Sequence, residues 1–84
     1  MDMGQVRLRF FARYAELVGV DERYLAVELP ATVADVVRRA RDEIPGAGRI
    51  PERPLVAVNL RHVQLDSRVA DGDEVAFLPP LAGG

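Results

Sequence analysis

Hydrophobic and polar residues alternate with a period of two near the start of the chain. Val6, Leu8 and Phe10 are separated by arginines. This pattern is typical of a strand with one buried face, so we expect these three side chains to face the core. Phe11 then falls on the arginine face, where a large aromatic residue is unusual. Two interpretations stay open: Phe11 lies under a loop, or it contacts a partner.

The next segment predicts a short helix and a second strand. Residues 12–18 combine apolar and polar side chains over about two helical turns. Gly19 follows them, and glycine commonly ends a helix. Residues 24–29 alternate again and stop at Pro30. The short connection between the two strands favours an antiparallel pair.

The clearest helical pattern begins at Thr32. Its hydroxyl can cap the backbone N–H of Asp35, and the Asp35 carboxylate can reach back to form a capping box. Apolar residues then recur at helical spacing, which predicts a buried stripe: Val33, Val36, Val37, Ala40 and Ile44. Asp35 precedes Arg39 by four residues, a spacing that favours an ion pair. Pro45-Gly46 should end the helix.

The segment after the helix predicts a loop and a hairpin. Residues 47–54 have the composition of a loop. Leu55-Val56-Ala57-Val58 is a continuous apolar run, which predicts a strand buried on both faces or nearly so. Residues 59–61 should form a turn after which His62-Val63 pairs back onto this strand.

The last part of the body predicts a turn and a final strand. Asp71-Gly72-Asp73 is a turn sequence in which glycine can adopt a positive φ. Residues 74–78 then alternate, with Val75 and Phe77 expected inward and Ala76 and Leu78 outward. The predicted fold class is α+β, with the Thr32 helix packed across one face of the sheet.

Composition limits the classes of function. The chain has 84 residues, 49% of them hydrophobic and 29% charged, so we expect a single small domain with little room for a deep substrate pocket. A net charge of −2 does not favour nucleic acid as a partner. The chain shows no membrane span or signal peptide, and the expected location is therefore cytoplasmic.

Several kinds of side-chain chemistry are absent or weakly supported. There is no cysteine and no lysine, because all 11 basic residues are arginine. No side chain can therefore act as a thiol nucleophile or as the amine acceptor of an isopeptide bond. His62 has no partner at metal-ligand spacing, and we interpret it as a surface residue without a role. No metal site is predicted, because the Asp71, Asp73 and Glu74 carboxylates fit a turn better than a calcium loop.

The cluster Arg38, Arg39 and Arg41 leaves two interpretations open. It can be a basic docking patch or a solvated helix face. Interspersed carboxylates favour the solvated face.

The C-terminal sequence Leu81-Ala82-Gly83-Gly84 follows directly after Pro79-Pro80. Two glycines form the thinnest available backbone, which can enter a channel too narrow for a side chain. The prolines cannot extend a sheet ladder and should direct the segment away from the body. Four extended residues reach roughly 13 Å. The alternative is an ordinary frayed terminus, and in either case we expect the segment from Leu81 to be mobile.

A terminal carboxylate becomes an acyl donor only after activation. ATP can convert it to an acyl-adenylate, from which a sulfur nucleophile gives a thiocarboxylate and an amine gives an amide. The chain has no phosphate-binding loop, so this step needs a separate enzyme that uses ATP, and we expect no cofactor bound to the chain itself.

The chain resembles the MoaD family, the small subunits of molybdopterin synthase, along nearly its whole length. The matching stretches are Leu8-Arg9-Phe10-Phe11-Ala12, Glu16-Leu17-Val18-Gly19, Ala57-Val58-Asn59, Asp71-Gly72-Asp73-Glu74-Val75-Ala76-Phe77 and Pro79-Pro80-Leu81-Ala82-Gly83-Gly84. The family usually carries Val or Ile where this chain has Leu81. The last two stretches together are the most specific part of the resemblance.

The resemblance implies a ubiquitin-like β-grasp fold: a mixed sheet of about five strands with one main helix across it. It implies a β-grasp domain over residues 1–78 and a flexible tail over residues 79–84. In this family the terminal glycine, here Gly84, is adenylated by an E1-like (MoeB-like) enzyme and converted to a thiocarboxylate. The tail then enters the large (MoaE-like) subunit within a heterotetramer and passes sulfur to molybdopterin.

The expected site residues follow from the resemblance and from the position of the tail. Gly84 carries the reacting carboxylate, and Gly83 keeps the tail narrow because it has no side chain. The partner-binding residues are expected to be Phe11, Leu78, Pro79, Pro80, Leu81 and Ala82. Phe11 and Leu78 should lie close together, because in a β-grasp the first and last strands run parallel at the sheet centre.

Other functions of the same tail stay open at this point. A related carrier delivers sulfur to thiamine, and similar carriers serve cysteine synthesis or tRNA thiolation. A ubiquitin-like protein modifier would use the same terminal glycines for isopeptide bonds. A purely structural interaction module is a third class.

Overall fold

The computed structural model describes residues 2–80. The expected site residues Leu81, Ala82, Gly83 and Gly84 lie outside the described residues, and so does the predicted mobility of that segment. The elements in chain order are β1 (Asp2–Phe10), α1 (Ala12–Val18), β2 (Glu22–Leu29), β3 (Ala31–Thr32), α2 (Val33–Glu43), the 3₁₀ turn η1 (Ala47–Arg49), β4 (Leu55–Val58), β5 (Arg61–Val63), β6 (Arg68–Val69) and β7 (Glu74–Leu78).

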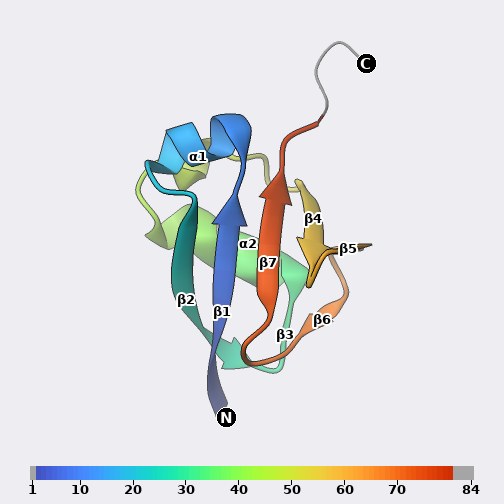
Figure 1. Cartoon of the computed structure of the whole chain (residues 1–84). Coiled ribbons are helices and arrows are strands. Elements are labelled where there is room, and N and C mark those ends of the chain that lie inside the picture. Colours follow the sequence, from blue (N-terminus) through green and yellow to red (C-terminus); the bar gives the residue numbers. More distant parts are fainter. Residues whose placement is uncertain (1, 81–84) are drawn as a thin grey trace.

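Five strands form the main sheet, in the order β2-β1-β7-β4-β5. The first and last strands are parallel neighbours, and every other pair in this sheet is antiparallel. Figure 1 shows α2 crossing behind the sheet while the front of the sheet faces the viewer. This is the predicted α+β fold, a mixed five-stranded sheet with one main helix across it, and the predicted parallel pairing of the first and last strands is confirmed.

Alternation along β1 and β2 sorts their side chains between two faces. The β1 residues Val6, Leu8 and Phe10 are buried, as predicted. Leu25 and Val27 on β2 are buried opposite them, while Ala26 between them is exposed. The first helix ends as predicted at Gly19, which has φ +83° and donates its N–H to Ala15.

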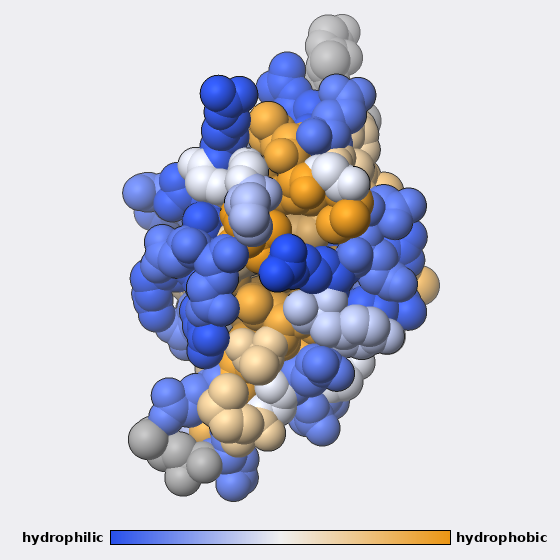
Figure 2. Space-filling view, turned by 90° about the vertical axis from the view of Figure 1, so that its left-hand side faces the viewer, coloured by the Kyte–Doolittle hydropathy of each residue, from blue (hydrophilic) through white to orange (hydrophobic). Residues whose placement is uncertain are grey.

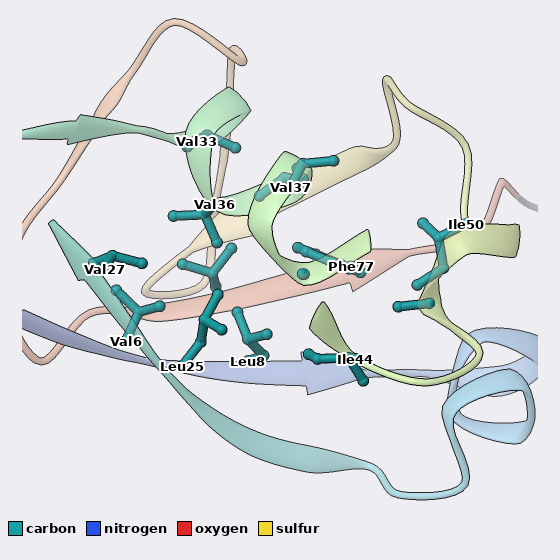
Figure 3. Close-up of a cluster of buried hydrophobic side chains, with 14 of the residues drawn as sticks. Val6, Leu8, Leu25, Val27, Val33, Val36, Val37, Ile44, Ile50 and Phe77 are labelled. Atoms are coloured by element: carbon teal, nitrogen blue, oxygen red, sulfur yellow. The ribbon is translucent and has the colours of Figure 1, made fainter. Parts of the chain in front are cut away.

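The second helix supplies the other half of the core. Its predicted apolar stripe is buried as a whole: Val33, Val36, Val37, Ala40 and Ile44. Figure 3 shows these side chains meeting Val6, Leu8, Leu25 and Val27 from the sheet, with Phe77 and Ile50 completing the cluster. Phe10 and Phe77 also meet edge to face, at 5.3 Å between ring centroids.

The predicted capping box at the start of α2 is confirmed. The Asp35 N–H donates to the Thr32 hydroxyl at 3.2 Å, and the Thr32 N–H donates to the Asp35 carboxylate at 2.9 Å. The Thr32 N–H lowers the pKa of Asp35, with a further contribution from the Arg38 guanidinium. The helix start is therefore held by groups that the sequence pattern identified.

The predicted ion pair between Asp35 and Arg39 is wrong. Arg38 binds Asp35 at 2.7 Å, and Arg39 binds Glu43 at 2.7 Å, one turn further along the helix. Glu43 follows Arg39 at the same spacing of four, so two carboxylates competed for one guanidinium. Arg41 donates instead to the carbonyl oxygens of Gly48 and Ile50, which ties the helix to the following segment. These contacts support the solvated-face interpretation of the arginines, with Arg41 as a structural exception.

The segment 47–54 is more ordered than a loop composition indicates. It contains the turn η1, and Ala47 and Ile50 are fully buried within the core. The sequence pattern predicted three strands after α2, and the structure has four within residues 2–80. The additional short strand β6 pairs with β3 in a separate two-stranded sheet. Strands of two residues carry no visible alternation, which is why the pattern did not predict them.

Gly46 is the glycine that the packing of η1 requires. It has φ +88°, and a Cβ built on it would lie far inside van der Waals contact with the Leu17 carbonyl oxygen of α1. We therefore predict that Gly46→Ala lowers the free energy of unfolding by about 2 to 4 kcal/mol, because backbone strain and a backbone clash add. Urea unfolding followed by circular dichroism would measure this change.

Gly19 provides a matched control for this substitution. It has a similar φ of +83°, but a Cβ there would meet no atom within 4 Å. Gly19→Ala should therefore cost only the conformational strain, about 1 to 2 kcal/mol. Equal losses in the two variants would mean that the approach of η1 to α1 is not tight.

Apolar atoms also reach the surface on the side that carries α1 and β2. Figure 2 shows a strip of apolar surface running between hydrophilic bands on this side. The partly buried hydrophobic residues of these two elements are Ala15, Leu17, Val18 and Leu29, and all of them pack against the core. This strip is the open edge of the layer between helix and sheet.

Candidate functional site

The outer face of the main sheet carries Ala76 and Leu78, which the sequence pattern placed there. The strand register places side chains of four strands in one row across this face, in the order Arg9, Ala76, Ala57 and His62. The next row toward the end of β7 pairs Leu78 with Leu55. No helix of residues 2–80 covers the sheet on the side that faces the viewer in Figure 1.

Leu78 ends β7, and Phe11 directly follows the end of the parallel neighbour β1, on the same side of the molecule. The residues before them, Phe10 and Phe77, are register partners in the parallel pair. Phe11 and Leu78 therefore each come one residue after the same row of the sheet. Phe11 is 39% exposed and Leu78 is partly exposed. Phe11 is therefore not buried in the core, and a large aromatic side chain is available to a partner next to Leu78.

Leu55 extends this apolar area and corrects a prediction. The apolar run of β4 was expected to be buried on both faces or nearly so, but Leu55 is 54% exposed. Its side chain lies on the uncovered outer face as the register partner of Leu78. The sequence pattern did not identify Leu55 as a site residue, because a continuous apolar run shows no alternation.

Two alanines lie next to these larger side chains on the outer face of the sheet. Ala76 lies on the outer face, as predicted, yet it is only 5% exposed, and its neighbour Ala57 is 6% exposed. Neighbouring side chains therefore cover most of both alanines. We call Phe11, Leu55, Ala57, Ala76 and Leu78 the outer-face patch.

A cluster of charged side chains borders the outer-face patch. Arg7 donates to the Glu74 carboxylate through a short hydrogen bond and also lies 3.7 Å from Glu22. The hydrogen bond with Glu74 raises the pKa of Arg7 above its ordinary value. Arg9 reaches the same Glu74 oxygen only at 3.5 Å, and its guanidinium lies 5.4 Å from the centre of the Phe11 ring.

The position of Glu74 is fixed by a turn rather than by its own strand alone. Asn59 and Leu60 both have positive φ and form the tight turn between β4 and β5. The Asn59 side chain accepts the Glu74 N–H at 2.9 Å and donates to the Asp73 carboxylate at 3.0 Å. These bonds lock the start of β7, and with it the charged border of the outer-face patch.

The chain leaves the sheet at the patch. After β7 ends at Leu78, Pro79 is partly exposed and Pro80 is exposed. Figure 1 shows this stretch continuing beyond the tip of β7, away from the strands. The segment that leads to Gly84 therefore starts beside Phe11, Leu55 and Leu78.

Other surfaces give no comparable arrangement. A broad groove of about 1450 Å³ lies between α2 and the β4–β5 edge, lined by Val37, Arg38, Arg41, Val63 and Leu65 among others. Leu55 and His62 also line this groove, so it reaches the outer-face patch at Leu55. His62 is exposed at the far end of the alanine row. Among residues 2–80, no group of three or more His, Asp or Glu side chains is placed to hold a metal ion.

Comparison with known proteins gives the family. The profile of the ThiS family matches residues 8–84 of the sequence. The chain belongs to the ThiS family. The match includes all of the outer-face patch and the terminal glycines. None of the helices within residues 2–80 is long and apolar enough to cross a membrane.

Two curated relatives of this ThiS-family chain align over most of its length. The molybdopterin synthase sulfur carrier subunit of Escherichia coli (strain K12) is 38% identical over 80 residues, which cover 94% of this chain and 99% of that protein. Small archaeal modifier protein 3 of Haloferax volcanii is 43% identical over 91 residues, covering 95% and 99%. The resemblance to molybdopterin synthase small subunits is thereby confirmed.

A solved structure supports the fold assignment in addition to the strand order. The crystal structure of SAMP1 from Haloferax volcanii superimposes with a TM-score of 0.84 at 28% identity, covering 96% of this chain and all of that one. Its close superposition shows that the fold of this ThiS-family chain is the ubiquitin-like β-grasp.

Proposed function

We propose that this protein is a sulfur carrier, the small subunit of a molybdopterin synthase, and that Gly84 holds the sulfur as a thiocarboxylate. The observation that carries the proposal is the exit of the chain from β7 beside an exposed apolar patch. A partner that binds the patch would receive the terminal glycines in a fixed direction. The Escherichia coli relative, named as a sulfur carrier subunit, supports the same function.

The chemistry follows from the groups that the chain possesses. The Gly84 carboxylate attacks the α-phosphate of ATP, which gives an acyl-adenylate and releases pyrophosphate. A sulfur nucleophile then attacks the acyl carbon and displaces AMP, which leaves sulfur in place of one carboxylate oxygen. The chain has no cysteine, so a persulfide on a side chain is excluded as the carried form.

The proposal implies two protein partners. An E1-like (MoeB-like) enzyme would supply the ATP site and activate Gly84, so that this chain binds no cofactor of its own. The large (MoaE-like) subunit would accept the tail, with two copies of each subunit in a heterotetramer. Phe11, Leu78, Pro79, Pro80, Leu81 and Ala82 would contact the partners, while Gly83 and Gly84 enter the active sites. We propose that this reaction takes place in the cytoplasm.

One observation favours a second function. The relative from Haloferax volcanii is named a modifier protein, which corresponds to transfer of the acyl group to an amine instead of to sulfur. Such a protein would be joined to lysines of other proteins. Because this chain has no lysine, its side chains could not accept another copy, and each modified lysine would carry a single copy unless an N-terminal amine is used.

Isolation of the tagged protein from its own cells tests the two functions against each other. We expect a stable non-covalent complex with a large synthase subunit, and a thiocarboxylate on part of the free chain. Covalent conjugates with many proteins, without such a complex, would contradict the carrier function and support the modifier. A Gly84 deletion variant serves as the control that can form neither product.

A further inference from the structure

Arg9 is a cation at the border of the outer-face patch whose charge is only partly balanced within residues 2–80. We propose that the large subunit carries a carboxylate opposite Arg9, and that this ion pair helps to select the correct partner. This inference rests on the proposed function, because it concerns the surface that would cover the patch. It adds a charge requirement to an interface that would otherwise be apolar.

The short terminal segment limits how far the partner's active site can lie from this surface. Four residues follow Pro80, and they reach roughly 13 Å when fully extended. An active site that receives Gly84 must therefore lie close to the end of β7. The body around that active site then has to rest against the adjacent side chains, which are Phe11, Leu55 and Leu78. The Arg9 guanidinium lies 5.4 Å from the centre of the Phe11 ring, so a partner that covers Phe11 would also cover Arg9.

The carboxylate that neighbours Arg9 is already engaged by another arginine. One oxygen of Glu74 accepts the short hydrogen bond from Arg7 and meets Arg9 only at 3.5 Å. Arg7 has Glu22 as a second acidic neighbour. The Arg9 Nε is buried and has no hydrogen-bond partner among residues 2–80. Arg9 therefore retains donors that Glu74 does not satisfy.

Docking would remove the water that now hydrates the guanidinium. The Arg9 side chain is still 33% exposed, and its guanidinium lies 5.4 Å from the centre of the Phe11 ring. An apolar partner surface would bury this charge without an acceptor, which strongly opposes binding. A carboxylate on the partner would instead form a charge-assisted hydrogen bond. Charge complementarity thus distinguishes the proper partner from other apolar surfaces.

Substitution of Arg9 tests the inference with the purified large subunit. Arg9→Met keeps a long apolar stem over Phe11 and removes only the charge, so the dissociation constant should rise at least about tenfold. Arg9→Lys should lose less, and Arg9→Glu should lose more. The dependence of binding on salt concentration should become weaker in Arg9→Met. Arg68→Met, at the exposed residue of strand β6 far from the end of β7 in Figure 1, is the matched control and should bind normally.

A charge exchange gives the positive result that a packing role would not produce. Carboxylates of the large subunit are replaced by lysine one at a time, and one of these variants should restore binding to Arg9→Glu. If Arg9→Met binds with unchanged affinity and unchanged salt dependence, the inference is wrong and Arg9 only packs on Phe11. If the unaltered chain itself fails to bind the large subunit, the proposed function fails instead. Thermal unfolding of each variant confirms that the fold is retained.

Discussion

Removal of Gly84 is expected to abolish the loading of sulfur, and Gly83→Val is expected to do the same. The deletion places the carboxylate one residue short of the activating site. The valine puts a branched side chain into a passage that we propose is sized for bare backbone. Both variants should release no pyrophosphate above background with the activating enzyme and ATP, and no thiocarboxylate should form when a sulfur donor is added.

Gly83→Ala is the matched control for the valine variant. It adds a single methyl group and should retain a measurable part of the loading rate. All three variants should unfold like the unaltered protein, because the core is built entirely from residues between Val6 and Phe77. Normal sulfur loading of the Gly84 deletion would show that the terminal glycine is not the acceptor.

Truncation of the outer-face patch is expected to weaken binding to the large subunit strongly. Phe11→Ala, Leu55→Ala and Leu78→Ala each remove an apolar side chain from the proposed centre of the interface. Such residues typically contribute about 1 to 2 kcal/mol each, which corresponds to roughly a 5- to 30-fold rise in the dissociation constant. Titration calorimetry with the purified large subunit would measure the change, and the double variant Phe11→Ala/Leu78→Ala should lose the most.

Leu60 offers a control of the same chemistry at the other end of the sheet. It is 87% exposed in the turn that follows β4, whereas Leu55 begins that strand beside Leu78. Leu60→Ala should leave the dissociation constant unchanged. Normal binding of the three patch variants, or an equal loss in Leu60→Ala, would place the docking surface elsewhere on the molecule.

The main elements of the fold could be predicted because their patterns are strong. Strand β1 alternates over five residues, and α2 combines a capping box with a continuous apolar stripe. Both signals depend only on residues close in sequence. The antiparallel pairing of β1 with β2 followed from a short connection, whereas the parallel pairing of β1 with β7 followed only from the resemblance to a known family.

Other features depend on contacts that no local pattern carries. Leu55 looks like any residue of a buried run, and its exposure follows from the uncovered outer face and from its register with Leu78. The two-residue strands β3 and β6 owe their existence to pairing across more than 30 residues. Arg39 had two carboxylates at equal spacing, so the sequence offered no basis for choosing Glu43.

The candidate site was predictable in part. The sequence placed Phe11 and Leu78 on the outer face, and the structure places them there at the ends of adjacent strands. It did not indicate that Arg9 and Arg7 share Glu74, because these groups are 65 and 67 residues apart in the chain. The roles of Leu81, Ala82, Gly83 and Gly84 stay predictions, since these residues lie outside the described part of the structure.

Intact-mass measurement of the sulfur-loaded protein tests the central claim most directly. The protein would be produced together with its activating enzyme and then analysed before and after incubation with ATP and a sulfur donor. The account predicts a mass increase equal to the exchange of one oxygen for sulfur, with fragmentation placing the change on Gly84. A chain that stays unmodified under these conditions, or that carries the added mass at any other residue, would contradict the account.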